Sequence, residues 1–149
     1  MPEILEVTID KFTFRVPTDR VYNEEGLWAL VEGDQVRVGL ADFIQQSSGD
    51  VAFATVKPEG TVLAFGDELM EIETIKVTIE LNSPVTGIVS AVNPTLEGSP
   101  EIINADPYGK GWVALIEPHD WEGDRTQLLD AASYFDLMKA KAEEEAKKL

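Results

Sequence analysis

The sequence contains no cysteine and a single histidine, His119. Without cysteine there is no disulfide, no thiol nucleophile and no thiolate metal ligand, which fits a reducing compartment. A lone histidine cannot complete the usual zinc ligand sets, and no glycine-flanked serine forms a nucleophile elbow. The segment 109–111 lacks the glycine spacing and the following Ser or Thr of a phosphate-binding loop. The sequence therefore predicts a protein without catalytic machinery, to which any redox chemistry must be brought from outside the chain.

Basic residues are also scarce, with 12 Lys and Arg against 28 Asp and Glu, for a formal net charge of −16. Such a charge repels phosphate backbones and anionic membrane surfaces, so we expect neither nucleic acid nor a membrane as partner. No apolar run approaches membrane-spanning length, and residues 1–6 lack the basic and apolar regions of a signal peptide. These features predict a soluble cytoplasmic protein.

The length and composition predict one globular domain over residues 1–149. A chain of 149 residues with 44% hydrophobic side chains can bury a real core. Its eight prolines and eleven glycines are scattered between apolar runs, which favours short strands over a long linker. Near-helical spacing of apolar residues predicts a C-terminal helix and tail over 126–149, with Asp124 or Thr126 as N-cap.

Most of the remaining chain favours strands. A short helix is expected over 41–48, capped by Asp42 and stopped at Gly49. Aromatic residues beside apolar runs usually pack, so Tyr22, Trp28, Tyr108 and Trp112 are expected in the core and turns. The runs that predict strands are 4–16, 27–31 and 35–40 around an acidic glycine turn, 51–56, a run from 61, 68–80, 85–92 and 112–116.

Lys76 is the only basic residue of the segment Glu71–Glu80, which is otherwise rich in Thr, Ile and Val. This composition favours a strand, and alternation counted from Ile75 places Lys76 on its polar face. By periodicity alone, Lys76 is an ordinary exposed strand lysine.

Many short motifs follow one another in a distinctive order and spacing from Tyr22 to Leu137. They include Trp28 near the start and Leu128-Leu129-Asp130-Ala131 near the end. Between them stand Gly66-Asp67, Glu73-Thr74-Ile75-Lys76, Ser83-Pro84-Val85-Thr86-Gly87, Val92-Asn93, Asn104, Asp106-Pro107-Tyr108-Gly109 and Gly111-Trp112. In this order and spacing, the chain resembles the glycine cleavage system H protein family.

This resemblance implies a mainly β fold, the barrel-sandwich hybrid of lipoyl and biotinyl domains, with two β-sheets, a short internal helix and a C-terminal helix. The lysine matching Lys76 would lie in a hairpin turn and carry lipoic acid in amide linkage. Glu73 and Glu80 would help a lipoylating enzyme to recognise that turn. Biotin carriers usually flank their lysine with methionines, whereas Ile75 and Val77 stand here, so the resemblance favours lipoyl over biotinyl.

The resemblance also implies partners. A lipoate-protein ligase or lipoyl transferase would attach the arm. The arm would accept an aminomethyl group from glycine decarboxylase, pass it to a folate-dependent aminomethyltransferase and be reoxidised by dihydrolipoamide dehydrogenase. The protein itself would then be a carrier and not an enzyme.

Several positions depart from the family pattern and leave two alternatives open. Gly26-Leu27 replaces a usual His-Glu pair, Val77 replaces a small alanine, and residues 1–20 form an N-terminal extension. One alternative is an H-like lipoate-binding protein of a heterodisulfide-reductase-like sulfur-oxidation pathway, with sulfur-oxidation enzymes as partners. The other is a non-lipoylated β-domain adaptor that binds through its acidic surface or its C-terminal helix.

Overall fold

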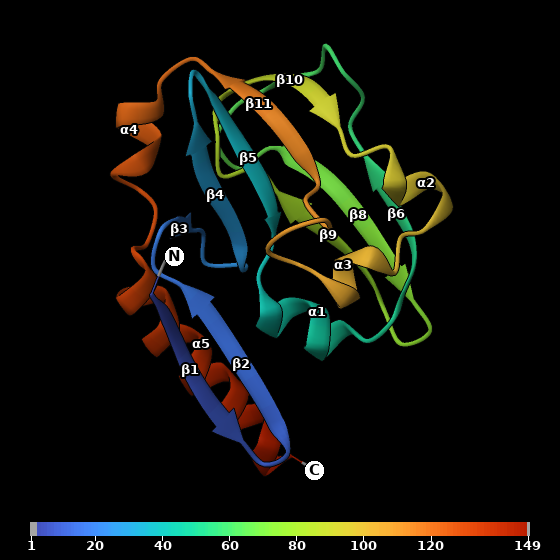
Figure 1. The fold of residues 1–149 in the computed structure, drawn as a ribbon, viewed down its shortest axis with the longest axis vertical. Helices are drawn as coiled ribbons and strands as arrows, with labels where there is room; N and C mark the ends of the chain where they lie inside the picture. Colours follow the sequence, from blue (N-terminus) through green and yellow to red (C-terminus); the bar gives the residue numbers. More distant parts are fainter. Residues whose placement is uncertain (1–2, 149) are drawn as a thin grey trace.

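The computed structural model describes residues 3–148, which fold mainly into antiparallel β-structure with short internal helices and a long C-terminal helix (Figure 1). The strands are β1 (Ile4–Ile9), β2 (Phe12–Pro17), β3 (Val21–Tyr22), β4 (Leu27–Glu32), β5 (Gln35–Leu40), β6 (Val51–Val56), β7 (Val62–Leu63), β8 (Glu68–Thr74), β9 (Thr78–Asn82), β10 (Gly87–Val92) and β11 (Ala114–Pro118). The helices are α1 (Asp42–Ser48), α2 (Thr95–Gly98), α3 (Ile102–Ala105), α4 (Trp121–Arg125) and α5 (Ala131–Lys147).

Two sheets enclose the main core. One has the strand order β3-β4-β5-β11-β10-β7 and the other the order β6-β8-β9. Alternating side chains from both sheets point into a single hydrophobic cluster, which includes Leu40, Ile72, Leu81, Val89 and Ile116, each at most 2% exposed. Burying a side chain of this size contributes about 1.5 to 3 kcal/mol. This core holds β8 and β9 in place beneath the turn that joins them.

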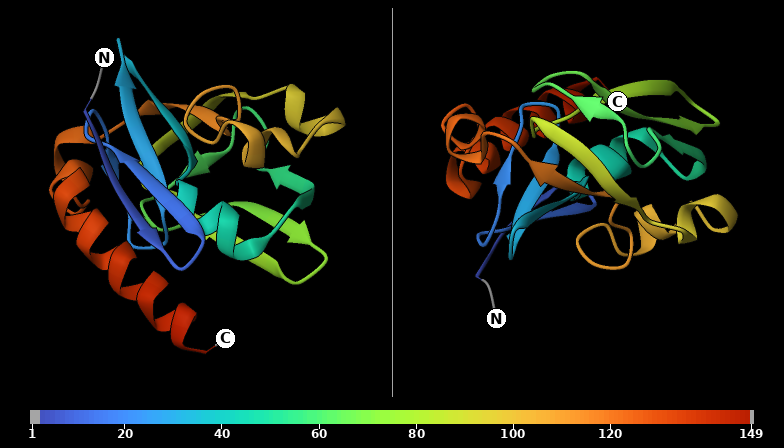
Figure 2. Two further views of the ribbon diagram at one scale, coloured as in Figure 1. Left: turned by 60° about the horizontal axis from the view of Figure 1, so that its bottom comes forward. Right: turned by 90° about the horizontal axis from the view of Figure 1, so that it is seen from above.

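A separate hairpin lies beside the C-terminal helix. Strands β1 and β2 pair from Ile4 with Pro17 to Ile9 with Phe12 and form a sheet of their own. Phe14 and Val16 of β2 join Tyr134 and Met138 of α5 in a second buried cluster. Figure 2 shows the hairpin and α5 side by side along one flank of the molecule. From residue 3 onward, the N-terminal extension is therefore packed against the rest of the molecule.

The observed architecture confirms the predicted mainly β fold with a short internal helix and a C-terminal helix, and it adds a third sheet, the β1–β2 hairpin. The last strand begins at Ala114, two residues later than expected. The C-terminal helix begins at Ala131, because Asp130 provides the cap: its carboxylate accepts a hydrogen bond from the Ser133 amide at 2.8 Å. Asp124 and Thr126 were therefore the wrong cap candidates.

The prediction of Asp42 as a helix cap was also wrong. The cap position of α1 is Ala41, and Asp42 is already helical and buried. Its carboxylate instead accepts hydrogen bonds from the Arg15 amide at 3.0 Å and from Gln45 Nε2 at 2.9 Å. A tertiary contact with β2 has drawn this side chain away from the helix end, where a surface aspartate would cap. The predicted stop at Gly49, whose φ is +89°, is confirmed.

The aromatic residues pack as expected. Trp28 is fully buried and its indole N–H donates to the carbonyls of Leu40 and Pro107. The Tyr22 and Tyr134 rings stack with centroids 4.5 Å apart. Burial raises the pKa of these two phenols, and that of Tyr108, well above the ordinary value of 10.0. Across residues 3–148, no helix has the length and apolar character needed to cross a membrane.

Candidate functional site at the β8–β9 turn

Lys76 lies in the turn that joins β8 to β9. The two strands are in register from Glu68 with Asn82 to Glu73 with Thr78, and beyond that pair the chain reverses. The strand-favouring run 68–80 is therefore divided by a turn that its composition did not reveal. Lys76 is exposed at the tip, and its neighbour Ile75 is 99% exposed.

The hydroxyl of Thr74 holds this turn together. Thr74 is 8% exposed, and its Oγ1 accepts hydrogen bonds from the backbone amides of Lys76 and Val77, both at 3.1 Å. The Thr74 amide donates to the Val77 carbonyl at 2.8 Å, which closes the reversal. Threonine hydroxyls favour turns through such local bonds to the backbone. The backbone of Lys76 is thus anchored while its side chain stays outside.

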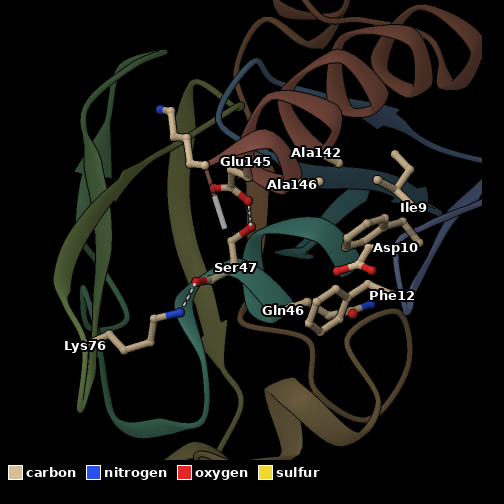
Figure 3. A pocket seen from close by; sticks show the side chains of 11 residues that line it. Ile9, Asp10, Phe12, Gln46, Ser47, Lys76, Ala142, Glu145 and Ala146 are labelled. Atoms are coloured by element: carbon tan, nitrogen blue, oxygen red, sulfur yellow. Dashed lines mark hydrogen bonds between the residues drawn. The ribbon is translucent and has the colours of Figure 1, made fainter.

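The Lys76 side chain reaches across to helix α1. Its Nζ donates to the Ser47 carbonyl at 3.1 Å, as Figure 3 shows. Ser47 lies in the last turn of α1, where carbonyls lack helical partners and carry partial negative charge. An ammonium group is therefore well placed there, although the contact is exposed and easily replaced by water.

Asn104 positions the segment from the end of α1 to the start of β6, which lies under the aliphatic part of the Lys76 side chain. Its side-chain amide donates to the Gly49 carbonyl at 3.0 Å and to Gln45 Oε1 at 3.0 Å, and its Oδ1 accepts from the Val51 amide at 2.9 Å. A Cβ at Gly49 would lie 3.4 Å from Lys76 Cδ, so the stem of Lys76 passes directly over this glycine. Asn104 therefore ties α3 to the end of α1 and to β6.

The predicted recognition residues Glu73 and Glu80 are both exposed on the outer face of the hairpin. Glu73 is paired across the strands with Thr78, and Glu80 with Glu71. The carboxylates of Glu80, Glu71 and Glu68 lie within 4.8 Å of one another. Within residues 3–148, no hydrogen bond or ion pair joins Glu73 or Glu80 to Lys76. The structure thus places both acids on the lysine's hairpin but brings neither into contact with its amine.

Gly26 and Leu27, which stand where the family usually has a His-Glu pair, are both buried. Leu27 is fully buried in the main core, and Gly26 has a φ of +103° with the Tyr134 hydroxyl 3.0 Å from where its Cβ would stand. The pair therefore offers no charged side chain to the surface around Lys76.

The roles of Ser47 and Gly49 were not predicted from the sequence. Both lie far from Lys76 in the chain, and the pairing of β6 with β8, which sets Val51 opposite Thr74, brings the end of α1 beside the turn. No separate role was predicted for Thr74, although threonine hydroxyls are known to hold turns by bonding to the backbone of the following residues.

An exposed lysine at a hairpin turn of a two-sheet β fold is the arrangement typical of lysine-linked carrier domains, in which a tethered group and not the protein performs the chemistry. Comparisons with known proteins identify the family. Residues 20–141 match the family described as Glycine cleavage H-protein.

Two curated relatives and one crystal structure illustrate the match. The chain is 39% identical to a glycine cleavage system H protein of Thermus thermophilus over 127 residues, 85% of this chain and 98% of that protein. It is 42% identical to the H protein of Mycobacterium avium over 123 residues, 80% of this chain and 93% of that one. The crystal structure of a Mycobacterium marinum H protein superposes with a TM-score of 0.70 at 29% identity, covering 80% of this chain and 95% of that one.

The chain belongs to the glycine cleavage H-protein family. Members of this family are non-catalytic carriers that hold lipoate and transfer an aminomethyl group within the glycine cleavage system. The resemblance drawn from the sequence is thereby confirmed, as are the predicted carrier function and the absence of an enzymatic role.

Proposed function

We propose that Lys76 is the lipoyl attachment site and that the arm on its Nζ carries the aminomethyl group between the enzymes of the glycine cleavage system. The observation that supports this most is the placement of Lys76: an exposed amine at the tip of a turn held by the Thr74 hydroxyl, inside the family match. The residues present fit the group. The backbone is anchored, the amine is accessible, and Ile75 beside it leaves the approach uncharged.

The environment of Nζ suits a tether that must move. As an ammonium, Lys76 is attracted to the partial negative charge at the end of α1. Acylation removes the positive charge and leaves a single neutral N–H donor, whose exposed hydrogen bond contributes little against water. The attached arm is then free to leave Ser47. When bound, lipoyl supplies a dithiolane on a long flexible chain, which a protein without cysteine cannot provide itself.

Recognition by the lipoylating enzyme, a lipoate-protein ligase or lipoyl transferase, is assigned to the hairpin. Glu73 and Glu80 lie on its outer face, so a cationic surface could read both while Ile75 and Lys76 enter the active site. The net charge of −16 accelerates encounter with basic patches on such partners. For the loaded cycle, the partners are glycine decarboxylase, aminomethyltransferase and dihydrolipoamide dehydrogenase, all in the cytoplasm.

The attachment site is tested by lipoylation with purified lipoate-protein ligase, followed by intact mass and peptide mapping. We expect one lipoyl increment, located at Lys76. Lys76→Arg should gain none, and its melting temperature should be unchanged because an exposed surface substitution shifts stability by only about 0.5 kcal/mol or less. Lys57→Arg is the matched control, because Lys57 follows a strand of the same sheet and pairs with Glu68 of β8 at 3.1 Å. A wild-type protein that is never lipoylated would instead indicate a β-domain adaptor.

The cargo is tested separately. Lipoylated protein is incubated with purified glycine decarboxylase and glycine, and the mass of the arm is followed. We expect the arm to be loaded and then to be discharged by aminomethyltransferase with tetrahydrofolate. A lipoylated arm that glycine decarboxylase cannot load would contradict the aminomethyl proposal and would favour the sulfur-oxidation alternative.

A further inference from the structure

Phe53 of β6 is 64% exposed and belongs to neither of the two hydrophobic clusters formed by residues 3–148. The strand pairing explains its position. Val51 pairs with Thr74 of β8 and Phe53 with Glu73, so Ala52 is an extra residue between the two pairs. A bulge of this kind re-aims the side chains that follow it. By strict alternation Phe53 would share the buried face of Val51, but the bulge turns it to the outer face of the sheet.

Other apolar side chains are exposed at the same end of this sheet. Ile75 is 99% exposed and Val77 is 40% exposed, and the two flank Lys76 in the chain. Phe53 is set beside this turn by its pairing with Glu73. Single exposed apolar side chains are common on protein surfaces, whereas a group of them rimmed by polar residues marks an interaction site.

The outer face beside Phe53 is acidic. Glu73 pairs directly with Phe53, and the next row of the sheet sets Glu71 of β8 opposite Glu80 of β9. A carboxylate oxygen of Glu71 lies within 4.8 Å of one of Glu80, and like charges directly opposite each other destabilise a strand pair. The segment 51–82 holds six acidic residues against two basic ones. A cationic surface placed against this face would relieve the repulsion.

The place of this face in the fold indicates which partner it fits. Strands β6, β8 and β9 lie side by side up to the turn that carries Lys76 (Figure 1). An enzyme that acylates Nζ must bring its reacting atoms into contact with the lysine, so its own surface must cover the chain around the turn. Enzymes that act later meet the far end of a long flexible arm and can bind elsewhere on the protein.

We propose that the outer face of the β6–β8–β9 sheet is the docking surface for the lipoylating enzyme and that Phe53 is its anchor. The proposal rests on the lipoylation of Lys76 proposed above, and it extends recognition from the hairpin to the neighbouring strand β6. Phe53 enters an apolar pocket of the enzyme, as buried aromatic anchors do at the centres of interfaces. Basic side chains of the enzyme face Glu71, Glu73 and Glu80 and fix the orientation in which Lys76 reaches the active site.

The test follows lipoylation of the full-length protein by purified lipoate-protein ligase, with lipoate and ATP, over a series of carrier concentrations. Phe53→Ser should raise the KM for the carrier about tenfold and leave kcat nearly unchanged, because a docking contact acts equally on the ground state and the transition state. Phe53→Tyr keeps the aromatic ring and should stay near the wild-type KM. A wild-type KM in Phe53→Ser overturns the docking surface alone, whereas a wild type that takes no lipoyl at Lys76 overturns the proposed function as well.

Val62→Ser is the matched control for the anchor. Val62 is 68% exposed and lies on β7, at the edge of the other sheet. This variant should keep the wild-type KM, and both serine variants should keep the wild-type melting temperature, because each replaces a side chain that is already largely exposed. Equal increases of KM in Val62→Ser and Phe53→Ser would refute the assignment of Phe53.

The acidic rim gives a second test in which docking and stability move in opposite directions. Glu71→Gln removes the repulsion with Glu80, so it should raise the melting temperature while it raises the KM about two- to fivefold. Glu117→Gln, at an exposed position of β11 in the other sheet, should leave the KM unchanged. A Glu71→Gln protein with an unchanged KM, or with a lowered melting temperature as well as a raised KM, would contradict a docking role for this carboxylate.

Discussion

The turn that presents Lys76 depends on one hydroxyl, so Thr74→Val is the sharpest test of the site. Valine has nearly the same shape as threonine but cannot accept a hydrogen bond. The substitution therefore removes the two 3.1 Å bonds from the amides of Lys76 and Val77, and also the bond that the hydroxyl donates to the Val77 carbonyl at 3.3 Å. It leaves the 2.8 Å backbone bond from the Thr74 amide to the Val77 carbonyl in place. The strand ladder up to Glu73 and Thr78 should remain intact.

The size of the effect follows from these three bonds of the hydroxyl. A typical intramolecular hydrogen bond contributes about 0.5 to 1.5 kcal/mol net, so the three together set a ceiling of about 1.5 to 4.5 kcal/mol. Lys76 and Val77 are exposed, so water can replace part of what is lost. Burying a valine methyl at Thr74 offsets a little more. We expect a local loss of about 1 kcal/mol, which is a factor of about 5 in the opening equilibrium of the turn.

Two measurements follow that opening. Amide hydrogen exchange at Lys76 and Val77 should accelerate by about fivefold in Thr74→Val, while exchange in the main core stays unchanged. Lipoylation at limiting ligase should slow, because a turn that samples other conformations presents the lysine correctly less often. Thr74→Ser keeps the hydroxyl and should restore both values.

Thr78→Val is the matched control. Thr78 is exposed on the outer face of the same hairpin, four residues along the chain, and the substitution is chemically identical. It should leave exchange and lipoylation as in the wild type. Lipoylation rates equal in the Thr74→Val and Thr78→Val proteins, with unchanged exchange at Lys76, would refute the view that the Thr74 hydroxyl holds the site.

Three further predictions concern the scaffold. Asn104→Asp should lower the free energy of unfolding, measured by urea titration, by about 2 kcal/mol, because a carboxylate cannot donate to the Gly49 carbonyl. An unchanged urea midpoint would contradict this. Asp130→Ala should lower the melting temperature at neutral pH. The hydrogen bonds from Ser133 lower the pKa of Asp130, so the cap stabilises above the unfolded pKa and is lost as pH falls through the folded one; wild type and variant should converge in acid. All three tyrosines have raised pKa values, so the unfolded chain loses these protons first and stability should decline above about pH 10; a phenol titrating normally in the folded protein would be contrary to this.

Much of the fold could be read from local patterns. The apolar runs predicted the strands β4, β5 and β6 to within one residue, because strand-favouring residues are bounded there by turn residues such as Gly33 and Gly49. Helix ends were less predictable. Asp42 is a good capping residue that makes a tertiary contact instead, and Asp130 caps a helix whose start the apolar spacing placed five residues too early.

The candidate site, too, was predictable from the sequence only in part. The prediction of Lys76 as the attachment site came from the resemblance of ordered motifs, since periodicity made it one strand lysine among others. Composition established only that the protein lacks thiols and is strongly acidic. The sequence alone thus determined the family, the mainly β fold and the carrier function. The tertiary structure decided what surrounds the lysine: the Thr74 hydroxyl in the turn, the Ser47 carbonyl at the end of α1, and Phe53 turned outward by the bulge in β6. Local propensity acts over a few neighbours, whereas Ser47 and Phe53 come beside the Lys76 turn only through the pairing of β6 with β8.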